Sequence, residues 1–249
     1  MGTFCLDNSR RAIDIFTTNT LMGKEVILVY PIYLIKKPIS SLQWATDNCD
    51  KAKLLIKMDD DISVDLPRII NNAYELPPYT IGGWVHQQLM VRRSRSKWAV
   101  TAEEYPKLFY PDFVSGWVYA TGFDTIKILV QSAKNMKRFW IDDVWLTGIV
   151  REEQNHQQID LQSWSSQFTP YHEHMQCCLN DSNFNCDFIA GPSNKEANNI
   201  IEFAKLAKRC YNSGSCAKRP LAQSIWNTCQ VKNPYFLQSS GVGKVLEIT

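Results

Sequence analysis

Three consecutive carboxylates, Asp59-Asp60-Asp61, follow directly on the apolar run Leu54–Met58 and constrain the fold more than any other feature of this chain. The run predicts a buried strand, and α/β sheets bind ligands at the carboxyl ends of their strands. Adjacent like charges repel one another, and a divalent cation is the simplest way to neutralise them. Carboxylate oxygens suit Mg²⁺, Mn²⁺ or Ca²⁺ rather than zinc. Acidic clusters also occur as solvated turns or helix caps, so both a metal site and a solvated turn are compatible with the triplet.

Helical patterns flank this strand on both sides. One opens at Ser41 and ends near Cys49, and after the acids Asp65 can cap a second helix whose early turn holds Pro67. The order helix, buried strand, acidic turn, helix is typical of an α/β fold, in which helices pack on a sheet. Hydrophobic patterning predicts three further elements: a strand over Val26–Tyr30, a short strand over Trp98–Val100 and an amphipathic helix over Asn194–Cys210.

The net charge of +2 on 249 residues gives no strong field, so binding to nucleic acid is not indicated. Residues 92–97, Arg-Arg-Ser-Arg-Ser-Lys, form the only dense basic run. This run is interpreted either as a solvated loop or as a contact for an anion such as a diphosphate.

Eight cysteines, six of them after residue 175, are many for a cytosolic chain of this length: Cys5, Cys49, Cys177, Cys178, Cys186, Cys210, Cys216 and Cys229. No paired C-x-x-C spacing for zinc is present, and an even count crowded into a tail predicts a disulfide framework. Asn180-Asp181-Ser182 is the sole N-glycosylation sequon. Both features favour the secretory pathway. The longest apolar run, residues 26–35, is too short to span a membrane, which takes about 20 residues.

Several motifs in this order resemble the β-1,3-galactosyltransferase-type family, which also includes β-1,3-N-acetylglucosaminyltransferases and the Fringe enzymes. The resemblance covers roughly residues 37–150. It rests on these residues: Leu42-Gln43-Trp44, Cys49, Ala52-Lys53, Lys57-Met58-Asp59-Asp60-Asp61, Arg93, Lys97-Trp98, Tyr105, Tyr110-Pro111-Asp112-Phe113, Gly116, Tyr119, Asp142-Asp143-Val144 and Gly148.

The resemblance implies a GT-A-like (Rossmann-like) α/β fold, a mixed sheet flanked by helices, followed by a cysteine-rich helical C-terminal extension. We expect a glycosyltransferase catalytic domain over residues 1–175, with its N-terminal part incomplete, and the extension over residues 176–249. Family members are typically anchored in the Golgi membrane by an N-terminal helix. This chain lacks such a helix, so we expect either an anchor upstream in a longer gene product or an incomplete sequence. The expected location is the Golgi lumen, as a type II membrane protein where the anchor is present.

For the donor side of the site, the resemblance implies that Asp61 is the direct metal ligand, with Asp59 and Asp60 holding the ribose or ordering the site. Arg93 is the donor-binding residue expected from the basic run. Related enzymes often complete the metal shell with a histidine placed after the base. His172 and His174 are the candidates, because alternation on an extended segment would point both imidazoles the same way; a surface histidine pair is the alternative.

On the acceptor side, Asp143 inherits the role of general base, and Asp142 stands where the family has Glu. Apolar neighbours desolvate this pair and mutual repulsion raises one pKa, which suits a base. The alternative is that one of the two caps a helix beginning at Val144. Tyr110 is expected either to line the sugar site or to pack in the core, and core packing is favoured for Trp98.

Together these residues predict an inverting hexosyltransferase that uses Mn²⁺ (or Mg²⁺). It would move galactose or N-acetylglucosamine from a UDP-sugar to a glycan or glycoprotein acceptor in β-1,3 linkage. One alternative is a catalytically inactive or truncated transferase-like protein with a scaffold role. A glycoside hydrolase also needs two carboxylates at a defined separation, but the acidic triplet would then be superfluous.

Overall fold

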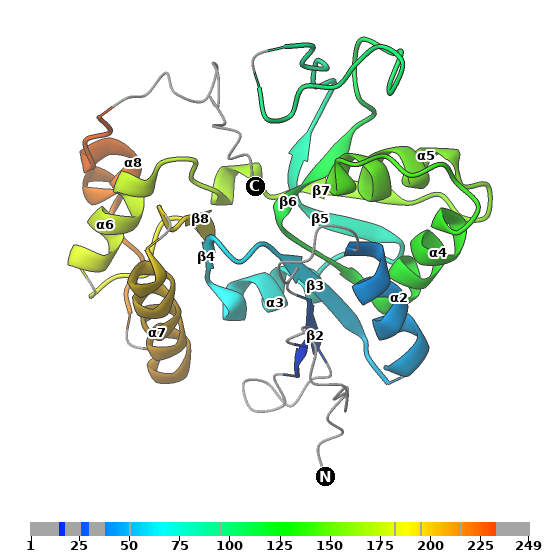
Figure 1. The fold of residues 1–249 in the computed structure, drawn as a ribbon. Helices are drawn as coiled ribbons and strands as arrows, with labels where there is room; N and C mark the ends of the chain where they lie inside the picture. The colour runs from blue at the N-terminus through cyan, green and yellow to red at the C-terminus, as the bar shows by residue number, and fades with distance from the viewer. Residues whose placement is uncertain are drawn as a thin grey trace, which may run out of the picture.

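A computed structural model describes residues 15–17, 26–29, 38–49, 51–94, 96–181, 183–194, 196–214 and 216–232. These residues form a mixed α/β architecture in which helices cover both faces of a central sheet (Figure 1). The predicted fold class, a mixed sheet flanked by helices with a cysteine-rich helical extension, is confirmed.

The central sheet has six strands in the order β1-β2-β3-β6-β5-β7. Their bounds are Ile15–Thr17 (β1), Val26–Val29 (β2), Leu54–Met58 (β3), Thr80–His86 (β5), Phe113–Gly122 (β6) and Asp160–Ser163 (β7). β2 runs parallel to β3, whereas β6 runs antiparallel to both β3 and β5. A small second sheet pairs β4 (Ile62–Val64) with β8 (Ala190–Pro192). The β2 and β3 strands predicted from apolar runs are therefore present.

In Figure 1 the helices fall into two groups on either side of the central sheet. One group contains α2 (Pro38–Asn48), α4 (Phe123–Ala133), the π-helix η1 (Val144–Val150) and the short α5 (Arg151–Glu153). The other contains α3 (Leu66–Tyr74), α6 (His172–Asn180), α7 (Ala197–Ser213) and α8 (Ile225–Thr228). Two short 3-10 helices, η2 (Ser165–Gln167) and η3 (Leu221–Gln223), complete the described elements.

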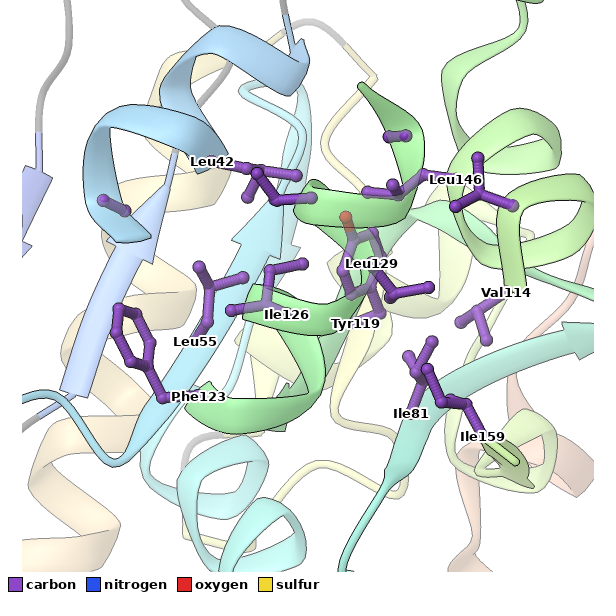
Figure 2. Packing of buried hydrophobic residues seen from close by; sticks show 14 of the residues in the cluster. Leu42, Leu55, Ile81, Val114, Tyr119, Phe123, Ile126, Leu129, Leu146 and Ile159 are labelled. Carbon is purple, nitrogen blue, oxygen red and sulfur yellow. The ribbon is translucent and has the colours of Figure 1, made fainter. Parts of the chain in front are cut away.

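Alternation along β3 divides the core into two layers. Leu55 packs with Tyr119 of β6 into the layer under α2 and α4, which Figure 2 shows at close range. Leu54 and Ile56 point to the opposite layer with Val118, under α3. Because successive strand residues face opposite sides, Lys57 lies on the same face of β3 as Leu55. Asp59, two positions after Lys57 and just beyond the strand, continues this face.

The local elements around the acidic turn follow the sequence closely. Asp65 caps α3, and its Oδ1 accepts a hydrogen bond from the Arg68 N–H at 3.1 Å. The helix expected over 194–210 is α7. The short strand expected over Trp98–Val100 is wrong, because the Ala99 N–H donates to the Ser96 carbonyl at 3.0 Å and closes a turn there.

The cysteine-rich extension is tied together by three disulfides, Cys177–Cys229, Cys178–Cys186 and Cys210–Cys216. Cys49 is also disulfide-bonded, and Cys5 lies outside the described residues. The expected boundary at residue 175 falls inside α6, and β8 of the extension pairs with β4 of the preceding part. The extension thus packs directly on the rest of the fold. Within the described residues, no helix has the length and apolar character needed to cross a membrane.

Candidate active site

The acidic turn after β3 contains an internal ion pair. Lys57 Nζ lies 2.7 Å from Asp59 Oδ1, and the lysine side chain is only 6% exposed. The two residues share one face of the strand, so the lysine reaches the first acid of the triplet directly. A protein cation therefore neutralises part of the charge that the sequence assigned to a metal ion.

The later acidic pair is held against the same region by β6. Asp143 Oδ2 accepts a hydrogen bond from the Gly116 N–H at 2.9 Å, and its Oδ1 accepts one from the Val144 N–H at 2.9 Å. Asp143 thus caps η1, as the helix-cap alternative predicted, and also contacts β6. Thr147 fixes η1 further, since its hydroxyl accepts from the Val114 N–H at 2.9 Å.

Hydrogen bonds connect the two acidic clusters through Lys57 and Gly116, and the charges of both clusters affect the same titratable groups. Burial raises the pKa of Asp143 to about 6, and the negative charge of Asp142 raises this pKa as well. Burial also raises the pKa of Asp59, in spite of Lys57, with a contribution from Asp142. Burial raises the pKa of the Tyr119 hydroxyl, and Asp142, Asp143 and Asp59 all add to this effect. Because Coulomb interactions weaken with distance, acids from both clusters lie around Tyr119.

Two acids of the triplet are more open to solvent than Asp59 and Asp143. Asp60 and Asp61 are exposed in the turn, and Asp142 is half-buried. The backbone at Asp61 is nonetheless fixed, because its carbonyl accepts hydrogen bonds from the Ser193 hydroxyl at 2.8 Å and from the Ser193 N–H at 3.1 Å. The extension therefore helps to shape the acidic turn.

The chemistry of the donor set fits a hard divalent cation. Asp60 and Asp61 offer exposed carboxylate oxygens, and Mg²⁺-type ions are commonly bound by one or two carboxylates together with substrate phosphates. Among the residues that the structure describes, no three His, Cys, Asp or Glu side chains are grouped as a metal-binding cluster. Asp61 stays the predicted ligand.

The two histidines expected near the metal do not lie on an extended segment; that expectation is wrong, because both belong to α6. Positions i and i+2 of a helix point in different directions. His174 is 4% exposed, and its Nδ1 lies 2.7 Å from the Thr169 hydroxyl. His172 is exposed, and its Nδ1 lies 3.4 Å from Glu173 Oε2. His174 is thus a core residue, and the structure does not bring either imidazole together with Asp61 in a metal cluster.

Arg93, expected to bind the donor, is occupied within its own loop. Its guanidinium donates hydrogen bonds of 2.7–3.2 Å to four backbone carbonyls, those of Val100, Thr101, Tyr105 and Lys107. These contacts close the segment between β5 and β6. The structure therefore supports a structural role for Arg93 and gives no support to a diphosphate contact.

Of the two roles weighed for Tyr110, the structure favours core packing. The residue is 6% exposed, and its ring packs near those of Tyr105, Phe113 and Phe139. Its buried hydroxyl has no hydrogen-bond partner among the residues that the structure describes. Trp98, expected in the core, is instead 42% exposed and stacks on Trp140 with ring centroids 5.9 Å apart.

Sequence reasoning assigned no role to Lys57 or Gly116, which together connect the two acidic clusters. Lys57 Nζ donates to the Gly116 carbonyl at 2.7 Å. The sequence contains one signal for Lys57. Residues two positions apart on a strand lie on the same face, so a lysine at this spacing from Asp59 can pair with it. No local signal identifies Gly116, because its partners are distant in sequence.

An acidic turn at the end of a strand in an α/β sheet, close to a half-buried carboxylate of raised pKa, marks a candidate active site. The galactosyltransferase family model matches residues 32–162, and the chain belongs to this family. Membership supports glycosyltransferase chemistry.

Curated relatives agree with this assignment. The chain is 30% identical over 118 residues to lactosylceramide 1,3-N-acetyl-beta-D-glucosaminyltransferase A of Xenopus laevis. The aligned region covers 45% of this chain and 31% of that protein. It is 28% identical over 125 residues to beta-1,3-galactosyltransferase 1 of Mus musculus and of Homo sapiens, covering 48% of this chain and 38% of each relative. The chain thus spans between 31% and 38% of the length of these relatives.

Proposed function

We propose that this protein is an inverting hexosyltransferase that moves galactose or N-acetylglucosamine from a UDP-sugar to a glycan acceptor in β-1,3 linkage. The observation that carries the proposal is the hydrogen-bonded connection from Asp59 through Lys57 and Gly116 to Asp143. This connection puts a donor-side acid and a candidate base in one site, as a transferase requires.

Asp143 serves as the general base in this proposal. The acceptor hydroxyl oxygen attacks the anomeric carbon, the bond from that carbon to the diphosphate oxygen breaks, and the hydroxyl proton passes to the Asp143 carboxylate. A base with a pKa of about 6 is mostly ionised at neutral pH and still accepts a proton effectively. A single displacement of this kind inverts an α-linked donor to a β-linked product.

The donor side would be formed by the acidic turn. Asp59 and Asp60 would orient the ribose, and Asp61 would hold Mn²⁺ (or Mg²⁺) together with the diphosphate. Such a cation, when bound, offsets the negative charge that develops on the leaving UDP. The hydrogen bonds from the Ser193 hydroxyl and N–H to the Asp61 carbonyl support this role, because they fix the turn before any ligand binds.

The choice of sugar and linkage is carried over from the names of the relatives, a 1,3-N-acetylglucosaminyltransferase and a β-1,3-galactosyltransferase. Acceptors would be glycans or glycoproteins, and the work would be done in the Golgi lumen. The disulfides of the extension support an oxidising compartment.

A radiolabelled transfer assay tests the proposal. UDP-galactose and UDP-N-acetylglucosamine are offered with Mn²⁺ and oligosaccharide acceptors, and the anomeric form of the product is read by NMR. We expect Asp143→Asn to lower kcat by about 10²- to 10⁴-fold, whereas Asp124→Asn, a control at an exposed acid of α4, leaves activity unchanged.

Activity that survives Asp143→Asn or chelation would contradict the assigned roles. Calorimetric titration with UDP and Mn²⁺ separates the enzyme from a transferase-like scaffold. The enzyme binds UDP saturably, and a scaffold without a donor pocket does not.

A further inference from the structure

We propose that Lys57 is a positioning residue that sets the place of the base Asp143 by holding Gly116 through its backbone carbonyl. The inference rests on the proposed function, because it concerns the same site. It goes beyond that function by giving a buried lysine a role on the acceptor side in addition to its ion pair on the donor side.

The ammonium of Lys57 is buried and has two partners. Its side chain is 6% exposed, and a buried ammonium is costly unless it is paired and hydrogen-bonded. Asp59 Oδ1 and the Gly116 carbonyl each lie 2.7 Å from Nζ. The lysine is therefore fixed to β3 through its own backbone and to β6 through a hydrogen bond.

Gly116 passes this constraint on to Asp143. Its carbonyl accepts from Lys57 Nζ, and its N–H donates to Asp143 Oδ2 at 2.9 Å. A Cβ on Gly116 would lie 3.0 Å from Lys57 Nζ and 3.4 Å from Asp143 Oδ2, so the three groups are closely packed. A shift of Gly116 would therefore move the hydrogen-bond donor that orients the base.

The β3–β6 register explains why these residues meet. Lys57 pairs with Tyr119, and just beyond β3 the Asp59 N–H donates to the Trp117 carbonyl at 3.0 Å. The lysine side chain runs along this antiparallel pair toward the end of β3 and reaches Gly116. Among the described residues, the charged and titratable groups that interact electrostatically with Asp143 include Lys57, Asp142 and the hydroxyls of Tyr119 and Tyr110.

A simpler role for Lys57 is to neutralise Asp59 alone. The two roles differ once Asp59 is uncharged: a pure counterion is then dispensable, whereas a positioning residue is still needed. The matched pair of variants is Asp59→Asn and Lys57→Met/Asp59→Asn. The double variant also avoids leaving a buried carboxylate unpaired, which protects the fold.

The first measurement is hydrogen exchange of the Gly116 amide by NMR, which needs no activity. We expect exchange at least about tenfold faster in Lys57→Met/Asp59→Asn than in Asp59→Asn, because loss of the lysine loosens the local backbone. Exchange of the Ile126 amide in α4 serves as the control for global stability. Equal Gly116 exchange in the two variants would overturn the proposal.

The second measurement is steady-state kinetics on the same pair. We expect the double variant to lose at least about tenfold in kcat relative to Asp59→Asn, with little change in KM for the donor, since a misplaced base slows the chemical step. An unchanged kcat would also overturn the proposal. If the wild-type protein has no transferase activity, the proposed function fails, and Gly116 exchange still tests the Lys57 link by itself.

Discussion

Asp143 is held in place by Gly116, a residue of β6 that lies 27 positions earlier in the chain. The hydrogen bond from the Gly116 N–H uses one carboxylate oxygen, and the Val144 N–H uses the other. Both oxygens thus accept backbone hydrogen bonds, which orient the carboxylate. The predictions below follow from this arrangement and from the contacts around it.

Gly116→Ala should impair activity through geometry. The new Cβ would lie 3.0 Å from Lys57 Nζ and 3.4 Å from Asp143 Oδ2, which forces the lysine or the base to shift. We expect kcat/KM to fall by about 10- to 100-fold, measured by sugar transfer. Gly122→Ala is the control in the same strand, since its Cβ would meet nothing closer than the Thr125 hydroxyl at 3.8 Å. Equal activity of the two variants would contradict the packing argument.

The pH dependence of kcat should report the charge of Asp143. Below its pKa of about 6 the carboxyl is protonated and cannot accept a proton, so we expect activity to fall as the pH drops through about 6. The negative charge of Asp142 disfavours ionisation of Asp143 and so raises this pKa. Asp142→Asn should therefore move the acidic limb of the profile to lower pH, whatever it does to the maximum rate. A limb that stays in place or moves upward would refute this coupling.

Arg93→Ala should loosen the segment between β5 and β6 without weakening donor binding. The guanidinium holds four backbone carbonyls of that segment, so we expect faster limited proteolysis between residues 96 and 108. Arg92→Ala is the control, because within the described residues the Arg92 guanidinium donates a single long hydrogen bond, to the Ser96 hydroxyl at 3.5 Å. UDP titration tests the other role. A large loss of UDP affinity in Arg93→Ala would contradict the purely structural role and support the predicted contact between Arg93 and the diphosphate.

The disulfides of the extension should contribute unequally to stability. Cys177–Cys229 closes a loop with a sequence separation of 52, whereas Cys210–Cys216 spans 6. Loop-closure entropy gives about 4 kcal/mol for the longer loop and about 2 kcal/mol for the shorter one. We expect Cys177→Ser/Cys229→Ser to lower the free energy of unfolding more than Cys210→Ser/Cys216→Ser, measured by urea denaturation. The reverse order would show that contacts outside these loops dominate.

Local patterns in the sequence were sufficient for the elements around the acidic turn. The apolar run before Asp59 became β3, and Asp65 caps α3 as expected. Asp143 caps η1, which the residues around Val144 also indicated. These features depend on neighbours within a few positions, so the sequence contains the information directly.

Features that depend on distant partners were missed or misjudged. His174 was expected on an extended segment, but Thr169 and the aromatic ring of Trp226 enclose it within the fold of the extension. Arg93 was expected to face an anion, but the path of its own loop provides carbonyls instead. In both cases the contacts depend on the path that the folded chain takes around the side chain.

The sequence alone determined the family, the strand that ends in three acids and the identity of the candidate base. Only the tertiary structure decided how these parts meet. Lys57 donates a hydrogen bond to Gly116, 59 positions later in the chain, and Gly116 donates one to Asp143, 27 positions later. The register of β3 against β6 and the packing of η1 on β6 bring these groups within hydrogen-bonding distance. Strand register depends on matching the hydrophobic patterns of both strands, and β3 and β6 lie far apart in the chain, so no pattern local to one of them reveals it.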